Sequence, residues 1–177
     1  MNVLEKFKLF IINPKGGFDS IKKEQPGDYI KYFFFIELIP VLILTIISIL
    51  KTPLTLKYFI GSLFVFVVFY FIYLLFAAIG GIWMHLWTYI FGGRKGLDNS
   101  LKIYFYSATP FFLFFVSFIQ DNLIRAVAIA AIYIWISVIE FFGLKKLQKL
   151  NSIRSVLVII FSNGIFLFIL LHGILIS

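Results

Sequence analysis

Long apolar stretches separated by short polar segments dominate the chain after residue 30. These stretches cover approximately residues 31–51, 59–80, 103–120, 123–144 and 155–176. A helix rises 1.5 Å per residue, so about 20 helical residues cross a membrane core of about 30 Å. The pattern therefore predicts an all-α protein, with residues 30–177 forming a polytopic bundle of five transmembrane helices.

Residues 1–29 have a different pattern, typical of an amphipathic helical segment on the cytoplasmic side. Apolar residues recur there at helical spacing, at Val3, Leu4, Phe7, Phe10 and Ile11. Charged residues occupy other positions of the same helix. After "NPKGG", a shorter helix is expected to begin with Phe18 and Ile21 and to end before Pro26. We expect this segment to lie on the membrane surface or on the bundle.

The second apolar stretch is too long for one span. No formal charge occurs in the 36 residues between Lys57 and Arg94, which would make about 54 Å of helix. We expect a break at "AAIGG" (77–81), a span over residues 60–80 and an interfacial extension over residues 82–91. The next glycines (Gly92, Gly93, Gly96) are expected to turn the chain, with Asp98 or Asn99 as the N-cap of the third span.

The distribution of charge predicts the orientation. Of the 16 Lys and Arg residues, 13 lie before the first span or in the loops after the second and fourth spans. Cytoplasmic loops carry this excess, so the N-terminus is expected in the cytoplasm and Ser177 outside the cell membrane. The net charge of +8 is expected to attract anionic lipid headgroups and not nucleic acid. The candidate headgroup contacts are Lys6, Lys8, Arg94, Lys95, Lys145 and Lys146.

Two carboxylates within spans, Glu37 and Glu140, are the strongest candidates for a functional site, because a charge inside a membrane helix is costly. Prolines in the first and third spans predict kinks with exposed backbone carbonyls. The candidate polar cavity therefore contains Glu37, Glu140, Ser107, Tyr106, Pro40 and Pro110. Alternatively, the prolines serve packing, and each carboxylate pairs separately with a cation of a loop.

Several kinds of chemistry find no support in the sequence. The chain has no cysteine, which excludes disulfides and thiolate metal sites. His85 and His172 lack the spacing of metal ligands, and "GGRKGLDNS" lacks the Gly-Lys-Ser/Thr of a phosphate-binding loop. We therefore predict no catalytic residue, no metal and no cofactor, and expect that the protein is not an enzyme.

Three segments resemble the Yip family in order and spacing: "NPKGGFDSIKKEQPGDY", "GGRKGLDNSLKIYFYSATPFFL" and "WISVIEFFGLKKLQKLNSIRSVLVII". The family consists of small five-span proteins named for their interaction with Ypt/Rab GTPases. For eukaryotic members, the resemblance implies hetero-oligomers and recruitment of Rab GTPases. This chain lacks the long N-terminal domain and the Asp-Leu-Tyr-Gly-Pro segment of many such members. It looks more like the compact prokaryotic members, so a Rab partner is not expected.

Two functions follow as hypotheses. The first is a non-enzymatic integral membrane protein that binds lipids or other membrane proteins, as a homo- or hetero-oligomer, and organises the membrane. The alternative is a small permease or ion carrier that uses Glu37 and Glu140 in a cavity facing the cytoplasm.

Overall fold

The computed structural model describes residues 1–50, 55–118 and 120–176, and all secondary structure in these ranges is helical. The elements, in chain order, are α1 (Val3–Ile12), α2 (Pro14–Ser20), α3 (Pro26–Leu50), α4 (Leu56–Ile90), α5 (Leu97–Ser107), the 3₁₀ helix η1 (Thr109–Phe118), α6 (Asn122–Lys146) and α7 (Ser152–Ile176). The predicted all-α class is confirmed.

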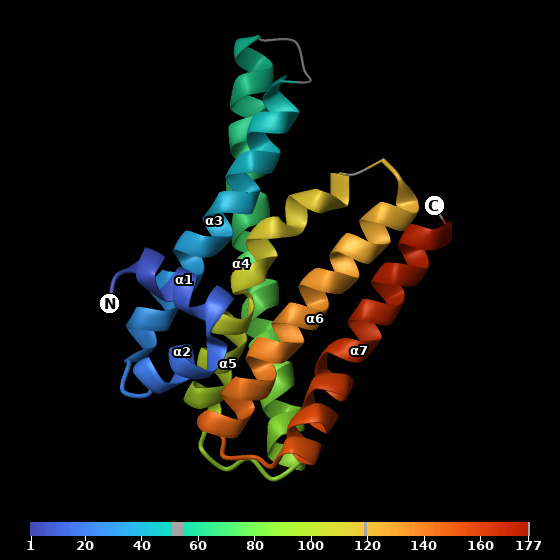
Figure 1. The fold of residues 1–177 in the computed structure, drawn as a ribbon. Coiled ribbons are helices and arrows are strands. Elements are labelled where there is room, and N and C mark those ends of the chain that lie inside the picture. Colours follow the sequence, from blue (N-terminus) through green and yellow to red (C-terminus); the bar gives the residue numbers. More distant parts are fainter. Residues whose placement is uncertain (51–54, 119, 177) are drawn as a thin grey trace.

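The long helices form an up-and-down bundle, and α1 and α2 pack across its side near one end (Figure 1). Helix α3, the pair α5–η1 and α7 run away from that end, while α4 and α6 return to it. We call it the basic end, because α1, α2 and the Lys- and Arg-containing connections 91–96 and 147–151 lie there. Three helices of the described chain are long and apolar enough to cross a membrane: Pro26–Ile47, Tyr58–Ile90 and Asn122–Lys146.

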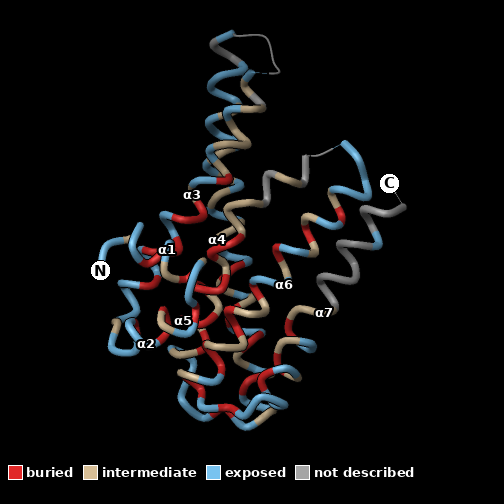
Figure 2. The backbone as a smooth tube through the Cα atoms, in the orientation of Figure 1, coloured by how far each residue is buried: buried red, intermediate tan, exposed pale blue. Residues whose placement is uncertain are grey.

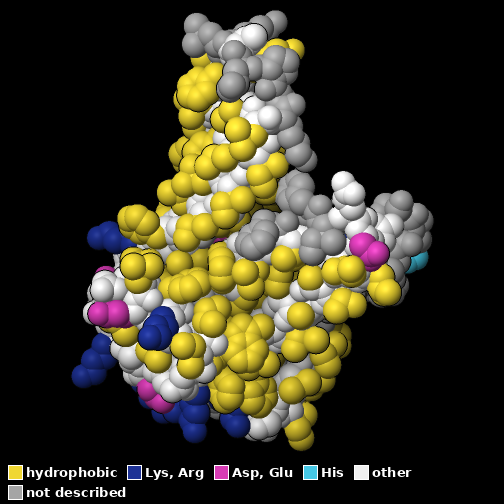
Figure 3. All heavy atoms as spheres, turned by 45° about the horizontal axis from the view of Figure 1, so that its top comes forward, with side chains coloured by type: hydrophobic (Ala, Val, Ile, Leu, Met, Phe, Trp, Pro, Cys, Tyr) yellow, Lys and Arg dark blue, Asp and Glu magenta, His cyan; other side chains and the backbone are white. Residues whose placement is uncertain are grey.

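Apolar side chains cover much of the outer surface. Figure 3 shows them over most of one face, with Lys and Arg gathered toward the basic end. Only 6% of the apolar 18-residue stretch of α4 that could cross a membrane is buried. Phe64, Phe71 and Phe76 of that helix are each at least 65% exposed. A water-soluble monomer rarely exposes a patch of this size, whereas lipid tails solvate it favourably.

The buried core lies in the half of the molecule nearest the basic end (Figure 2). Its largest fully buried side chains include Phe10 of α1, Phe18 of α2, Tyr32 of α3 and Tyr106 of α5. The Phe10 ring stacks on that of Tyr106, with 4.4 Å between centroids, and meets Phe18 edge to face at 5.0 Å. Burial of these rings holds α1 and α2 on the bundle.

Helix α2 begins four residues earlier than the sequence pattern indicated, at Pro14 instead of Phe18. Asn13 caps the helix by accepting from the Gly16 amide at 3.0 Å, and Pro14 suits the first helical position. The Phe10 ring packs directly against Gly17 of this helix. A residue with a side chain would not fit there, because its Cβ would lie only 3.0 Å from the nearest ring atom. The predicted end before Pro26 is confirmed, since α2 ends at Ser20.

The break expected at residues 77–81 is wrong. Helix α4 is continuous over 35 residues, or about 52 Å. The glycines there allow α5 to approach closely, because a Cβ on Gly81 would lie 2.7 Å from Leu101 and one on Gly80 would clash with the Tyr104 hydroxyl. Tertiary packing therefore explains these glycines, and glycine is tolerated within membrane helices.

The expected third span, residues 103–120, is not one α-helix. Helix α5 ends at Ser107, and the chain continues after Ala108 as η1. Pro110 has no N–H, so the Tyr106 carbonyl four residues earlier loses its helical donor. The Thr109 hydroxyl donates to that carbonyl at 2.6 Å instead. The predicted irregularity at Pro110 is thus confirmed, whereas α3 continues as an α-helix through Pro40.

The glycine-rich connection 91–96 turns the chain as predicted. Gly92 and Gly96 have φ values of +96° and +86°, a region that non-glycine residues rarely adopt. The N-cap of α5 is Gly96, however, and not Asp98 or Asn99. Both residues lie in the first turn of α5. The Asp98 carboxylate accepts a hydrogen bond from the Tyr29 hydroxyl of α3, and the Asn99 amide donates one to the Lys95 carbonyl in the preceding connection.

Candidate functional site: two buried carboxylates

Glu37 of α3 lies inside the bundle and is 0% exposed. The Tyr73 hydroxyl of α4 donates to its Oε2 at 2.9 Å. Its other oxygen, Oε1, is buried and has no hydrogen-bond partner among the described residues. Glu37 lines a cavity of about 760 Å³ between α3 and α4, which Pro40 also lines. A carboxylate with one unpartnered oxygen therefore borders an apolar cavity.

Glu140 of α6 is equally buried, at 1% exposure, but both of its oxygens have a polar neighbour. Asn163 Nδ2 of α7 donates to Oε2 at 2.5 Å, and the Ser107 hydroxyl of α5, which donates to the Tyr104 carbonyl at 2.8 Å, lies 3.4 Å from Oε1. Glu140, Asn163 and Ser107 line a second cavity, of about 520 Å³. Glu140 thus links α6 to α5 and α7 through polar contacts.

The two carboxylates line different cavities, which share the side chains of Tyr73 and Phe111 as a wall. Among the described residues, the ion pairs include neither Glu37 nor Glu140. The sequence also allowed that each carboxylate pairs with a cation of a loop. The described structure contains no such ion pair. An isolated carboxylate at such a place can bind a proton, a cation or a hydrogen-bond donor.

Tyr106 and Pro110 were expected in the same cavity, but they line neither cavity. The Tyr106 hydroxyl points toward the basic end and donates to Glu24 Oε2 at 2.5 Å. Lys6 pairs with the other oxygen of Glu24 at 2.6 Å. Tyr106 is therefore part of the contact between the N-terminal helices and the bundle.

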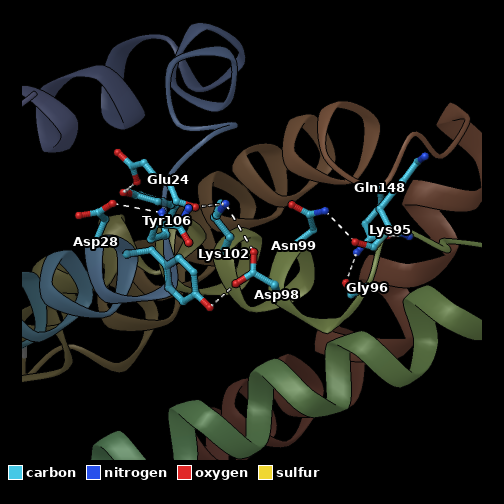
Figure 4. Close-up of polar contacts among 11 residues, drawn as sticks. Glu24, Asp28, Lys95, Gly96, Asp98, Asn99, Lys102, Tyr106 and Gln148 are labelled. Atoms are coloured by element: carbon cyan, nitrogen blue, oxygen red, sulfur yellow. Dashed lines mark hydrogen bonds and ion pairs between the residues drawn. The ribbon is translucent and has the colours of Figure 1, made fainter.

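A polar cluster at the basic end, which sequence reasoning missed, includes this contact (Figure 4). Lys102 is 2% exposed and lies between two partners: it donates to the Glu24 carbonyl at 2.8 Å and lies 3.6 Å from Asp98. Asp98 also accepts from the Tyr29 hydroxyl at 2.8 Å. The spacing of Asp98 and Lys102, four residues apart on a helix, was the available signal.

Gln148, in the connection between α6 and α7, forms a second group of contacts there. Its Oε1 accepts from the Lys95 amide at 3.0 Å, and its Nε2 donates to the Gly96 carbonyl at 3.0 Å (Figure 4) and to Ser100 Oγ at 2.9 Å. His85 Nδ1 lies 2.9 Å from the same Ser100 oxygen. Ser100 is 0% exposed, so this Ser–His contact joins α4 to α5 and has no access for a substrate.

Of the six cations expected to contact headgroups, Lys6 is buried and paired with Glu24. Lys8, Arg94, Lys95 and Lys145 are exposed. Lys146 is half-buried and pairs with Asp19 of α2 at 2.7 Å. Hydrogen bonds from Lys146 and Lys22 lower the pKa of Asp19 to about 2. The described residues contain no cluster of His, Asp and Glu that would hold a metal ion.

This architecture, with long apolar helices and an apolar outer surface, defines a multi-span helical membrane protein. The family model of the Yip1 domain matches residues 7–174, from α1 almost to the end of α7. The chain therefore belongs to the Yip1 domain family, as the resemblance of the three sequence segments indicated. The comparison with curated proteins and the comparison with solved structures found no match.

Proposed function

We propose that this Yip1-domain protein is a non-enzymatic component of the cell membrane that binds anionic lipids and other membrane proteins at its basic end and organises the membrane around it. It crosses the membrane five times, with the N-terminus in the cytoplasm and the C-terminus outside. Family membership and the apolar surface support the membrane placement. The excess of cations at the basic end supports the orientation.

The observation that carries the proposal is the outer stripe of α1. Leu4, Lys8 and Ile12 follow one another at four-residue spacing, so they share one face of the helix. All three are exposed, Leu4 at 76% and Ile12 at 67%. The other face holds Phe10 and Lys6 against the bundle. An exposed stripe with a cation between two apolar side chains suits the boundary between headgroups and acyl chains.

Further exposed cations lie at the same, basic end of the molecule. They are Lys15, Lys22, Lys23, Lys31, Arg94, Lys95, Lys145, Lys149 and Arg154. Each cation near an anionic surface adds on the order of 1 kcal/mol of attraction. Together they favour a leaflet rich in anionic lipid over a zwitterionic one.

The experiment uses the full chain in a mild neutral detergent, incubated with equal amounts of phosphatidylglycerol and phosphatidylcholine that carry the same acyl chains. We expect retained lipid to be enriched in phosphatidylglycerol, and the enrichment to fall in the variant Lys8→Gln/Lys15→Gln/Lys23→Gln. Arg125→Gln, at the opposite end of the molecule, is the control and should keep it. Equal retention of both lipids by the unmodified chain would contradict the proposal.

Assembly with a second copy or with other membrane proteins is part of the proposal. It is supported by the outer face of α4, which the rest of the chain leaves largely uncovered. Crosslinking in native membranes, followed by identification of the crosslinked chains, tests this part. Recovery of uncrosslinked monomer alone would argue against it.

A second candidate function, a small permease or ion carrier, is favoured by one observation: the two buried carboxylates border cavities that share a wall. It requires that Glu37→Gln or Glu140→Gln abolishes proton- or cation-linked flux in proteoliposomes. If the unmodified chain supports no flux, this candidate is excluded.

A further inference from the structure

The cavity that contains Glu37 is elongated, and two helix faces form most of it. Its residues on α3 are Glu37, Pro40, Val41, Leu44 and Thr45, and those on α4 are Tyr58, Gly61, Ser62, Val65, Phe66, Phe69 and Tyr73. Both sets recur at helical spacing of three and four residues. The α4 set runs from Tyr58 to Tyr73, which are 15 residue steps or about 22 Å apart along the helix axis. The cavity is therefore a long groove with Glu37 and Tyr73 at one end and Tyr58 at the other.

Small side chains make room in this groove. A Cβ added at Gly61 would find no heavy atom within 4 Å. Thr45 is also short, and its hydroxyl donates to the Val41 carbonyl at 2.9 Å, within its own helix. The volume, about 760 Å³, lies within the usual range for small-molecule sites, roughly 300 to 1,000 Å³. Apolar atoms dominate the walls, so the groove suits a hydrocarbon chain.

The polar end of the groove is incomplete. Glu37 Oε2 has its donor in Tyr73, but the buried Oε1 has none among the described residues, and no cation pairs with the carboxylate there. A buried carboxylate with an unfilled acceptor position is costly. A ligand that supplies a positively charged donor at this point would offset that cost with a charge-assisted hydrogen bond.

We propose that this groove is a binding site for a single-chain cationic amphiphile, whose protonated amine pairs with Glu37 Oε1 and whose hydrocarbon chain lies between α3 and α4 toward Tyr58. Charge complementarity favours the amine over a neutral or anionic head. The position between two outer helices suits a ligand that arrives from the lipid phase. The site is separate from the cationic surface of the basic end, which selects the opposite charge.

The test measures binding of radiolabelled dodecylammonium to the full chain in neutral detergent micelles at pH 7, with dodecanol and dodecanoate as probes of equal chain length. We expect about one dodecylammonium per chain above the micelle background. Dodecanol should bind at least about tenfold more weakly, because it lacks the charged donor, and dodecanoate more weakly still.

Glu37→Gln keeps an acceptor for Tyr73 but removes the charge, and should weaken dodecylammonium binding by about tenfold or more. Gly61→Leu should also weaken it, because the new side chain fills the groove without touching Glu37. Gly27→Leu is the matched control, since Gly27 also has open space around a Cβ but lies outside the groove. Circular dichroism and gel filtration check that each variant folds.

Two results would overturn the assignment. Equal binding of the amine and the alcohol would mean that lipid or detergent tails simply fill the groove. Binding that survives Glu37→Gln but is lost in Glu140→Gln would place the amine in the second cavity. Because Glu37→Gln is the smaller change, it decides the question even if Gly61→Leu fails to fold.

Discussion

The Tyr73 hydroxyl of α4 donates to Glu37 Oε2 of α3 at 2.9 Å, and it is the hydrogen-bond donor that the described chain offers to this buried carboxylate. The pair joins two neighbouring helices at the point where the groove and the second cavity meet.

Loss of the Tyr73 hydroxyl should therefore destabilise the α3–α4 pair. We expect Tyr73→Phe to lower the free energy of unfolding by about 1 to 3 kcal/mol, because it leaves both buried carboxylate oxygens without a donor. The double variant Tyr73→Phe/Glu37→Leu should recover part of this loss, since removal of both partners is less costly than removal of one. Unfolding in mixed micelles, followed by circular dichroism, measures both changes. Additive losses would contradict the pairing.

The N-terminal helices provide a second prediction, which compares two lysines on one helix. Lys6 is 7% exposed and pairs with Glu24, whereas Lys8 is exposed. Lys6→Met should destabilise the protein by about 1 to 3 kcal/mol and release α1, because Glu24 loses its ion pair and the Tyr106 ring loses the ammonium group 5.8 Å from its centroid. Lys8→Met should change the stability by less than about 0.5 kcal/mol. Limited proteolysis of residues 1–25, together with unfolding curves, distinguishes the two variants. Equal protection of both would place Lys6 on the surface.

The same two lysines show how far the sequence alone could lead. The composition and the length of the apolar stretches were sufficient to predict a helical membrane protein, because the polarity of a stretch's own residues decides whether it lies in lipid or in water. The turn at Gly92 and Gly96 was also a local property. Lys6 and Lys8 are indistinguishable by charge, however, and the burial of Lys6 depends on Glu24, 18 residues away.

Errors within the spans have the same origin. Gly80 and Gly81 suggested a break because local propensity disfavours glycine in helices, yet their role depends on α5, about 20 residues later. Glu37 and Glu140 were recognised from their cost in the membrane. Their partners, Tyr73 and Asn163, were not, since a single sequence does not show which polar groups meet.

Asp19 predicts a specific pH dependence for the contact between α2 and α6. Its pKa is lowered to about 2, chiefly by the hydrogen bond from Lys146 and then by that from Lys22. A lowered pKa means that the contact contributes stability above the unfolded value of about 3.9 and loses it as the pH falls toward about 2. Between pH 7 and pH 5 the contact should not change.

Carboxyl-carbon NMR of the folded protein checks this value, with the Asp19 signal identified by its loss in Asp19→Asn. We expect a midpoint near 2, and a larger upward shift in Lys146→Met than in Lys22→Met. A midpoint close to the ordinary value of about 3.9 would show that Lys146 does not hold Asp19 in solution.

Gly143 is the point where α6 meets both α2 and α5, and it allows a test of this packing. A Cβ there would lie 2.7 Å from Phe18 and 2.8 Å from Ile103, both fully buried side chains. Gly143→Ala should therefore force the three helices apart and cost about 1 to 3 kcal/mol. Gly61→Ala, at a helical glycine with open space around it, should instead stabilise the protein by about 0.4 to 1 kcal/mol. Unfolding of both variants in the same detergent measures the difference, and a neutral Gly143→Ala would mean that α2 does not pack on α6 as the structure shows.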